Sequence, residues 1–75
     1  MDSLPEIEKR LQQWKKAAVE RPGDRFAKEE FFSALKDMVA ALQASAPSDD
    51  RIPALKRAAN ALSEELFGRT WFAGA

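Results

Sequence analysis

The chain contains no histidine, no cysteine and no tyrosine among its 75 residues. Without histidine, a nucleophilic serine lacks its usual general base, so hydrolase-type catalysis is disfavoured. Without cysteine there is neither a disulfide framework nor a thiolate metal site, and small secreted domains usually need one of the two. We therefore expect a non-enzymatic protein of a reducing compartment, most simply the cytoplasm. Four serines are interpreted as helix-surface and loop residues: Ser33, Ser45, Ser48 and Ser63.

Residues that could hold a ligand are also sparse. The three glycines lie far apart in the sequence, so no glycine-rich phosphate-binding loop is present. The acidic pairs are neighbours in the chain. Two of them lie on predicted helices, where neighbours point about 100° apart and do not share a site, and Asp49-Asp50 is interpreted as a helix cap. The sequence therefore predicts no cofactor and no metal centre. These pairs are Glu29-Glu30, Asp49-Asp50 and Glu64-Glu65.

Charge and hydropathy argue against two classes of partner. Twelve basic residues balance twelve acidic ones, and the isoelectric point is near 6.2. Such a chain has no global field that would attract nucleic acid or an anionic membrane. No segment approaches the ~20 apolar residues of a membrane span, and the first residues do not resemble a secretory signal. We expect a soluble protein without a membrane partner, with nucleic-acid binding kept as a minor alternative.

What the sequence does contain is apolar residues at helical spacing. The first such stripe predicts a helix over residues 4–21, opened by a capping box of Ser3 and Glu6 and closed by the turn Arg21-Pro22-Gly23-Asp24. Asp24 is then free to cap a second helix over residues 25–44. The first stripe comprises Leu4, Ile7, Leu11, Trp14 and Ala18.

The second helix has the widest apolar arc of the three, which is typical of a helix packed between two neighbours. We therefore place it at the centre. A third helix is expected over residues 51–67, capped by Asp50 or Ser48 and ended by Gly68. The arc of the second helix comprises Phe31, Leu35, Met38 and Leu42, flanked by Phe32, Val39, Ala27, Ala34 and Ala41. The third stripe comprises Ile52, Leu55, Ala59, Leu62 and Leu66.

Three helices joined by short loops predict an all-α fold, an antiparallel three-helix bundle, with residues 1–68 as a single domain and residues 69–75 as a short aromatic tail. The same spacing also allows a helical hairpin that buries its stripes only by pairing with a second copy. The oligomeric state is left open by the sequence.

Packing accounts least well for a few aromatic residues. Phe67 lies about 100° from the centre of the third stripe, Trp71 and Phe72 follow Gly68, and Phe26 points opposite the main seam of its helix. Aromatic side chains are prominent anchors of protein interfaces. The tail either folds back over the bundle or docks on a partner. The predicted partner-binding residues are Phe26, Phe67, Arg69, Trp71 and Phe72.

Together these observations favour a protein-interaction module: a small adaptor, inhibitor or accessory subunit that uses a helical face and the C-terminal aromatic residues. The second hypothesis is a homo-oligomeric structural protein that shares the broad face of its second helix between copies. The third is a small nucleic-acid-binding regulator, which would reveal itself by a salt-sensitive affinity for DNA or RNA.

Overall fold

The computed structural model describes residues 3–74, so the first two residues of the predicted domain and the last residue of the predicted tail lie outside it. This range forms the helices α1 (Leu4–Glu20), α2 (Arg25–Ser45) and α3 (Arg51–Phe67), and it contains no β-strand. The predicted helix boundaries are confirmed to within one residue. The predicted all-α three-helix fold is also confirmed, and every residue of the three predicted stripes is buried or half-buried.

The N-terminal ends of α1 and α2 test two of the predicted caps. The carboxylate of Asp24 accepts a hydrogen bond from the backbone N–H of Ala27 at 3.2 Å, as predicted for the start of α2. The predicted capping box at Ser3 is wrong: Ser3 occupies the N-cap position in an extended conformation, but its side chain makes no capping hydrogen bond. Pro5 lies in the first turn of α1, where its missing N–H costs nothing.

The start of α3 is capped by a different residue from those predicted. Asp50 makes no capping hydrogen bond through its side chain, whereas the carboxylate of Asp49 accepts the backbone N–H of Arg51 at 2.8 Å. The Arg51 guanidinium also donates to both carboxylate oxygens of Asp49, at 3.1 and 3.0 Å. These hydrogen bonds from the Arg51 side chain and backbone hold the pKa of Asp49 below its ordinary value.

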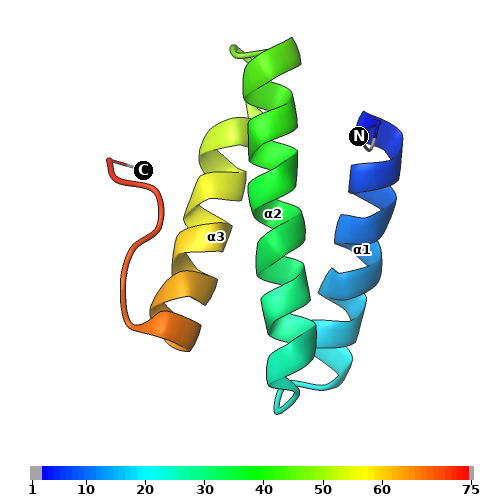
Figure 1. Ribbon diagram of the computed structural model, residues 1–75, viewed down its shortest axis with the longest axis vertical. Helices are drawn as coiled ribbons and strands as arrows, with labels where there is room; N and C mark the ends of the chain where they lie inside the picture. Colours follow the sequence, from blue (N-terminus) through cyan, green and yellow to red (C-terminus); the bar gives the residue numbers. More distant parts are fainter. Residues whose placement is uncertain (1–2, 75) are drawn as a thin grey trace.

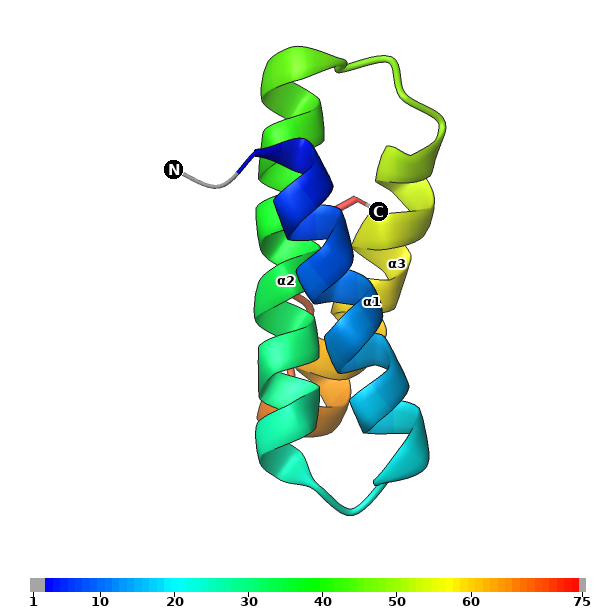
Figure 2. The same cartoon turned by 90° about the vertical axis from the view of Figure 1, so that its right-hand side faces the viewer.

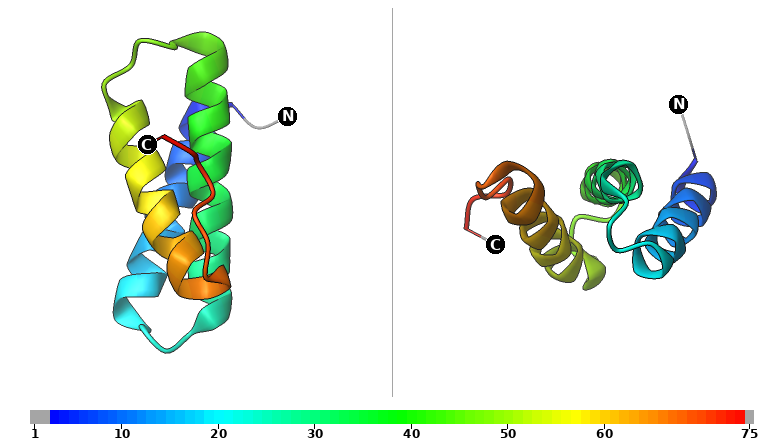
Figure 3. Two further views of the ribbon diagram at one scale, coloured as in Figure 1. Left: turned by 90° about the vertical axis from the view of Figure 1, so that its left-hand side faces the viewer. Right: turned by 90° about the horizontal axis from the view of Figure 1, so that it is seen from below.

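Helix α2 lies between α1 and α3, as its wide apolar arc predicted (Figure 1). No Cα atom of α1 comes within 8 Å of a Cα atom of α3, and the end-on view in Figure 3 shows the two helices on either side of α2. The arc is therefore covered from two directions by the chain's own helices. Its buried members are Ala27, Phe32, Ala34, Leu35, Met38, Val39 and Leu42.

The connecting loops lie at opposite ends of the molecule, so consecutive helices run antiparallel (Figure 2).

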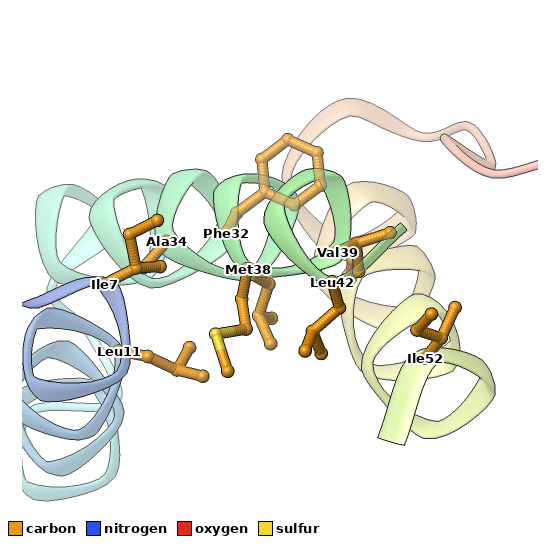
Figure 4. Close-up of a cluster of buried hydrophobic side chains, with 10 residues drawn as sticks. Ile7, Leu11, Phe32, Ala34, Met38, Val39, Leu42 and Ile52 are labelled. Atoms are coloured by element: carbon orange, nitrogen blue, oxygen red, sulfur yellow. The ribbon is translucent and has the colours of Figure 1, made fainter. Parts of the chain in front are cut away.

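Side chains of all three helices meet around α2 (Figure 4), where Met38 and Leu42 point toward the space between α1 and α3. Phe32 points to the other side of α2, toward the C-terminal segment. An ion pair between Arg10 and Asp37 joins α1 to α2. No helix in residues 3–74 is long and apolar enough to cross a membrane.

Candidate functional site

The C-terminal segment turns back at Gly68. This residue has a left-handed backbone conformation, with φ at 71°, and its N–H donates to the carbonyl oxygen of Glu64 at 3.0 Å. Glycine adopts this conformation without the steric cost that a Cβ would add. The predicted helix stop is confirmed, and the chain beyond it runs back along α3, on the side of the molecule away from α1 (Figures 1 and 3).

The returning segment is fastened to α3 mainly by one side chain. The Asn60 carboxamide oxygen accepts the backbone N–H groups of Trp71 and Phe72, at 3.1 and 2.7 Å. The amide nitrogen of Asn60 donates to the carbonyl oxygen of Phe72 at 3.0 Å. One helical side chain thus pairs with three backbone groups that lie outside any helix, which is how an irregular segment satisfies its polar backbone.

A second contact corrects one of the serine predictions. Ser63 is fully buried, and its hydroxyl donates to the carbonyl oxygen of Arg69 at 2.6 Å. Its interpretation as a helix-surface residue is wrong, because the returning segment covers it. A further hydrogen bond, from the Thr70 hydroxyl to the Glu64 carboxylate at 3.1 Å, lies at the exposed edge. The segment is therefore held along several residues.

Folding back brings aromatic rings from different parts of the chain together. The ring of Phe32 on α2 lies 5.6 Å from that of Phe67 and 5.6 Å from that of Trp71, with the indole edge-on at 87°. The ammonium group of Lys36 lies 4.5 Å from the centre of the Trp71 ring and 5.0 Å from that of Phe32. Edge-to-face rings and a cation over their faces are favourable arrangements.

These groups surround a surface hollow of about 330 Å³ between the outer side of α2 and the returning segment. Phe67 and Trp71 each keep 46% of their surface exposed at its rim. We call this hollow and its lining the tail face. Its residues are Glu29, Phe32, Ser33, Lys36, Phe67, Arg69 and Trp71.

The five predicted partner-binding residues fall in three places. Phe67, Arg69 and Trp71 line the tail face together. Phe72 is half-buried against the hydrophobic core, with the Lys56 ammonium 5.8 Å from its ring centre. Phe26 lies apart from them, packed edge-on against Trp14 of α1 with ring centres 5.6 Å apart, and it is 60% exposed.

Sequence reasoning missed the partners that build this site. Phe32 and Lys36 are one helical turn apart and therefore share a side of α2, but Phe32 was interpreted only as a flank of the core. Asn60 and Ser63 also share a side of α3, where both residue types are weak helix formers. A polar pair in the interior of an apolar-striped helix was the available signal for an attached segment.

Another hollow lies between α1 and α3, over the open side of the bundle. It has a volume of about 230 Å³ and is bordered by residues of all three helices. Two of its lining residues, Leu11 and Met38, are already buried by their own neighbours. None of its lining residues is a large exposed apolar side chain, whereas Phe67 and Trp71 of the tail face are. Its lining residues are Glu8, Leu11, Gln12, Met38, Arg51, Ala54 and Leu55.

Within residues 3–74 no group of three or more acidic side chains is placed to hold a metal ion. Comparisons with protein-family models, with curated proteins and with solved structures find no match to this chain. Its function is therefore inferred from its own residues.

Proposed function

We propose that this chain is a protein-interaction module that presents the tail face to another protein. The observation that carries the proposal is the exposure of Phe67 and Trp71, each 46%, although the segment that bears Trp71 is hydrogen-bonded to α3. Large aromatic side chains bury about 150–250 Å² each and are enriched among the residues that dominate binding energy.

The way the segment is held adds to this support. Ordering a loop on binding costs conformational entropy, and a surface that is already ordered avoids that cost. Asn60 fixes the backbone of Trp71 and Phe72 before any partner arrives. The two sequence alternatives, a tail that folds back and a tail that docks, are therefore compatible: folding back positions two of the aromatic side chains for docking.

The homo-oligomer hypothesis was based on the apolar arc of α2, and this surface is buried within the chain. The broad arc of α2 was to be shared between copies, but α1 and α3 of the same chain cover it. Self-association would have to use another surface, such as the tail face. Light scattering on a sizing column, at low micromolar and at higher concentration, distinguishes a monomer from such an assembly.

Affinity capture with a matched pair of variants tests the proposed function. Trp71→Ala removes the exposed indole of the tail face, whereas Val19→Ala shortens a side chain on α1 that is more exposed, at 72%. We expect wild type and Val19→Ala to recover the same partner, and Trp71→Ala to bind it about thirtyfold more weakly, as truncating a hot-spot residue does. Equal recovery by all three proteins, or by none, would contradict the proposal. Circular dichroism confirms that each variant keeps its helices.

A further inference from the structure

We propose that the tail face recognises an acidic segment of its partner, with a large apolar side chain seated in the hollow and carboxylates beside Lys36 and Arg69. This inference rests on the proposed function and adds the chemistry of the partner. We favour an acidic partner because the positive charges of the tail face have no counter-charge within the described part of the chain, whereas its one carboxylate does.

Three charged residues line the tail face: Glu29, Lys36 and Arg69. Glu29 already has a partner, since its carboxylate accepts a hydrogen bond from the guanidinium of Arg25 at 2.8 Å. Neither Lys36 nor Arg69 forms an ion pair with any residue in the described part of the chain. The lining therefore carries two cations without a counter-charge and one carboxylate that is neutralised.

The charges that border the tail face reduce this excess but do not cancel it. The ammonium of Lys28 and the carboxylate of Glu65 lie 3.0 Å apart and offset each other. The carboxylate of Glu64 accepts the Thr70 hydroxyl but keeps its negative charge. In a chain with no net charge, the tail face is thus a local positive surface, with Lys36 and Arg69 against Glu64. Complementary charge steers association and selects among partners, even where it adds little to affinity.

The two cations also differ in how they are held. Lys36 lies over the rings of Trp71 and Phe32, so its ammonium is positioned at the edge of the hollow. Arg69 is held only by its backbone, because its carbonyl oxygen accepts a hydrogen bond from the Ser63 hydroxyl. Its guanidinium is left to form the paired hydrogen bonds that arginine makes with a carboxylate.

The apolar part of the hollow sets the size of the anchor. Its volume of about 330 Å³ lies at the lower end of the range of about 300–1,000 Å³ that ligand sites span. The walls that meet there are the rings of Phe32, Phe67 and Trp71. Such a hollow suits one large side chain of a bound protein, such as leucine, phenylalanine or tryptophan, flanked by its acidic neighbours.

Single-stranded nucleic acid is the other class of ligand that binds to surfaces made of aromatic rings and cations. It would need a basic track along which the phosphate backbone runs. Here only two of the lining residues, Lys36 and Arg69, are basic, and they form no continuous track. The observations therefore favour the acidic protein segment, and nucleic acid becomes an outcome of the test.

The experiment is selection of a random peptide library displayed on phage against the whole immobilised chain. We expect the selected peptides to be enriched in aspartate and glutamate within a few positions of a large apolar residue, relative to the unselected library.

The best peptide is then synthesised with a fluorescein label, and its binding to the chain is titrated by fluorescence anisotropy. Arg69→Glu should weaken its binding about three- to tenfold, and added salt should weaken it further. Lys9→Glu, the same charge reversal at an exposed site on α1, should leave binding unchanged.

The outcomes separate the two proposals. Peptides that require Trp71 but show no acidic enrichment, or that bind Arg69→Glu as tightly as wild type, overturn the acidic-partner inference and leave the proposed function standing. Failure to select any peptide, or binding that Trp71→Ala does not weaken, overturns both. A fluorescein-labelled single-stranded oligonucleotide that binds with the same dependence on Trp71 and Arg69 would replace the protein segment by nucleic acid. Circular dichroism shows that each variant remains folded, and Arg69→Gln removes the positive charge without introducing a negative one.

Discussion

The attachment of the C-terminal segment through Asn60 is the feature most open to a quantitative test. Asn60→Ala removes three hydrogen bonds to the backbone of Trp71 and Phe72. Each such bond contributes about 0.5–1.5 kcal/mol to stability. Because Trp71 is half-exposed and water can replace part of what is lost, we take the lower half of that range, or about 2 kcal/mol in total. Alanine returns about 0.5 kcal/mol through its higher helix propensity. The expected net loss in the free energy of unfolding is about 1–2 kcal/mol.

Urea titration followed by circular dichroism measures that loss, and the fluorescence of Trp71 in a Trp14→Phe background reports on the segment itself. We expect the Trp71 emission to shift to longer wavelength in Asn60→Ala, because the indole leaves its contacts with Phe32 and Lys36. Gln43→Ala is the matched control, since Gln43 is an exposed amide on α2 that makes no hydrogen bond through its side chain. A loss below about 0.5 kcal/mol together with unchanged Trp71 emission would refute the anchoring role of Asn60.

Three further predictions concern the core and the helix ends. Leu35→Ala, at a position 2% exposed, should lower the free energy of unfolding by about 2–5 kcal/mol in urea titration, and a loss below about 1 kcal/mol would contradict its place in the core. Gly68→Ala should cost about 1–2 kcal/mol, because its φ of 71° strains a residue with a Cβ although nothing lies within 4 Å. Gly23→Ala, equally uncrowded but without a positive φ, should be neutral or slightly stabilising, and equal losses in the two glycine variants would refute the conformational argument. The lowered pKa of Asp49 means that its bond to Arg51 stabilises the fold above the unfolded-state pKa of about 3.9 and is lost as pH falls below it. Asp49→Asn should therefore be less stable than wild type at neutral pH and similar to it in strong acid, and a difference that does not change with pH would contradict this assignment.

The tail face lies on the side of α2 away from the space between α1 and α3. Met38 and Leu42 point into that space, whereas Phe32 points to the other side of α2, toward the C-terminal segment (Figure 4). The segment runs back along α3 (Figures 1 and 3), and it reaches α2 through the contact of Trp71 with Phe32. Phe67 and Trp71 each keep 46% of their surface exposed there.

Much of the fold could be predicted because the relevant signals are local. The helix boundaries, the central position of α2 and the stop at Gly68 follow from apolar spacing and from residues that favour or forbid a backbone conformation. The errors were of another kind. The side-chain cap predicted at Ser3 is not formed. At the start of α3, where Asp50 or Ser48 was predicted, the carboxylate of Asp49 accepts the backbone N–H of Arg51 instead, because several polar side chains in that turn were suited to the role.

The sequence by itself determined which residues form helices and which face of each helix is buried, because a repeat of 3.6 residues per turn is written directly in the order of the side chains. It also singled out Phe67, Arg69 and Trp71 among its candidate partner-binding residues. Only the tertiary structure decided that these three meet Phe32 and Lys36 around one hollow. The segment after Gly68 has no periodicity, and its course depends on hydrogen bonds from Asn60 and Ser63. In the sequence, those two polar side chains lie within an apolar-striped helix, but nothing there identifies the segment that they bind.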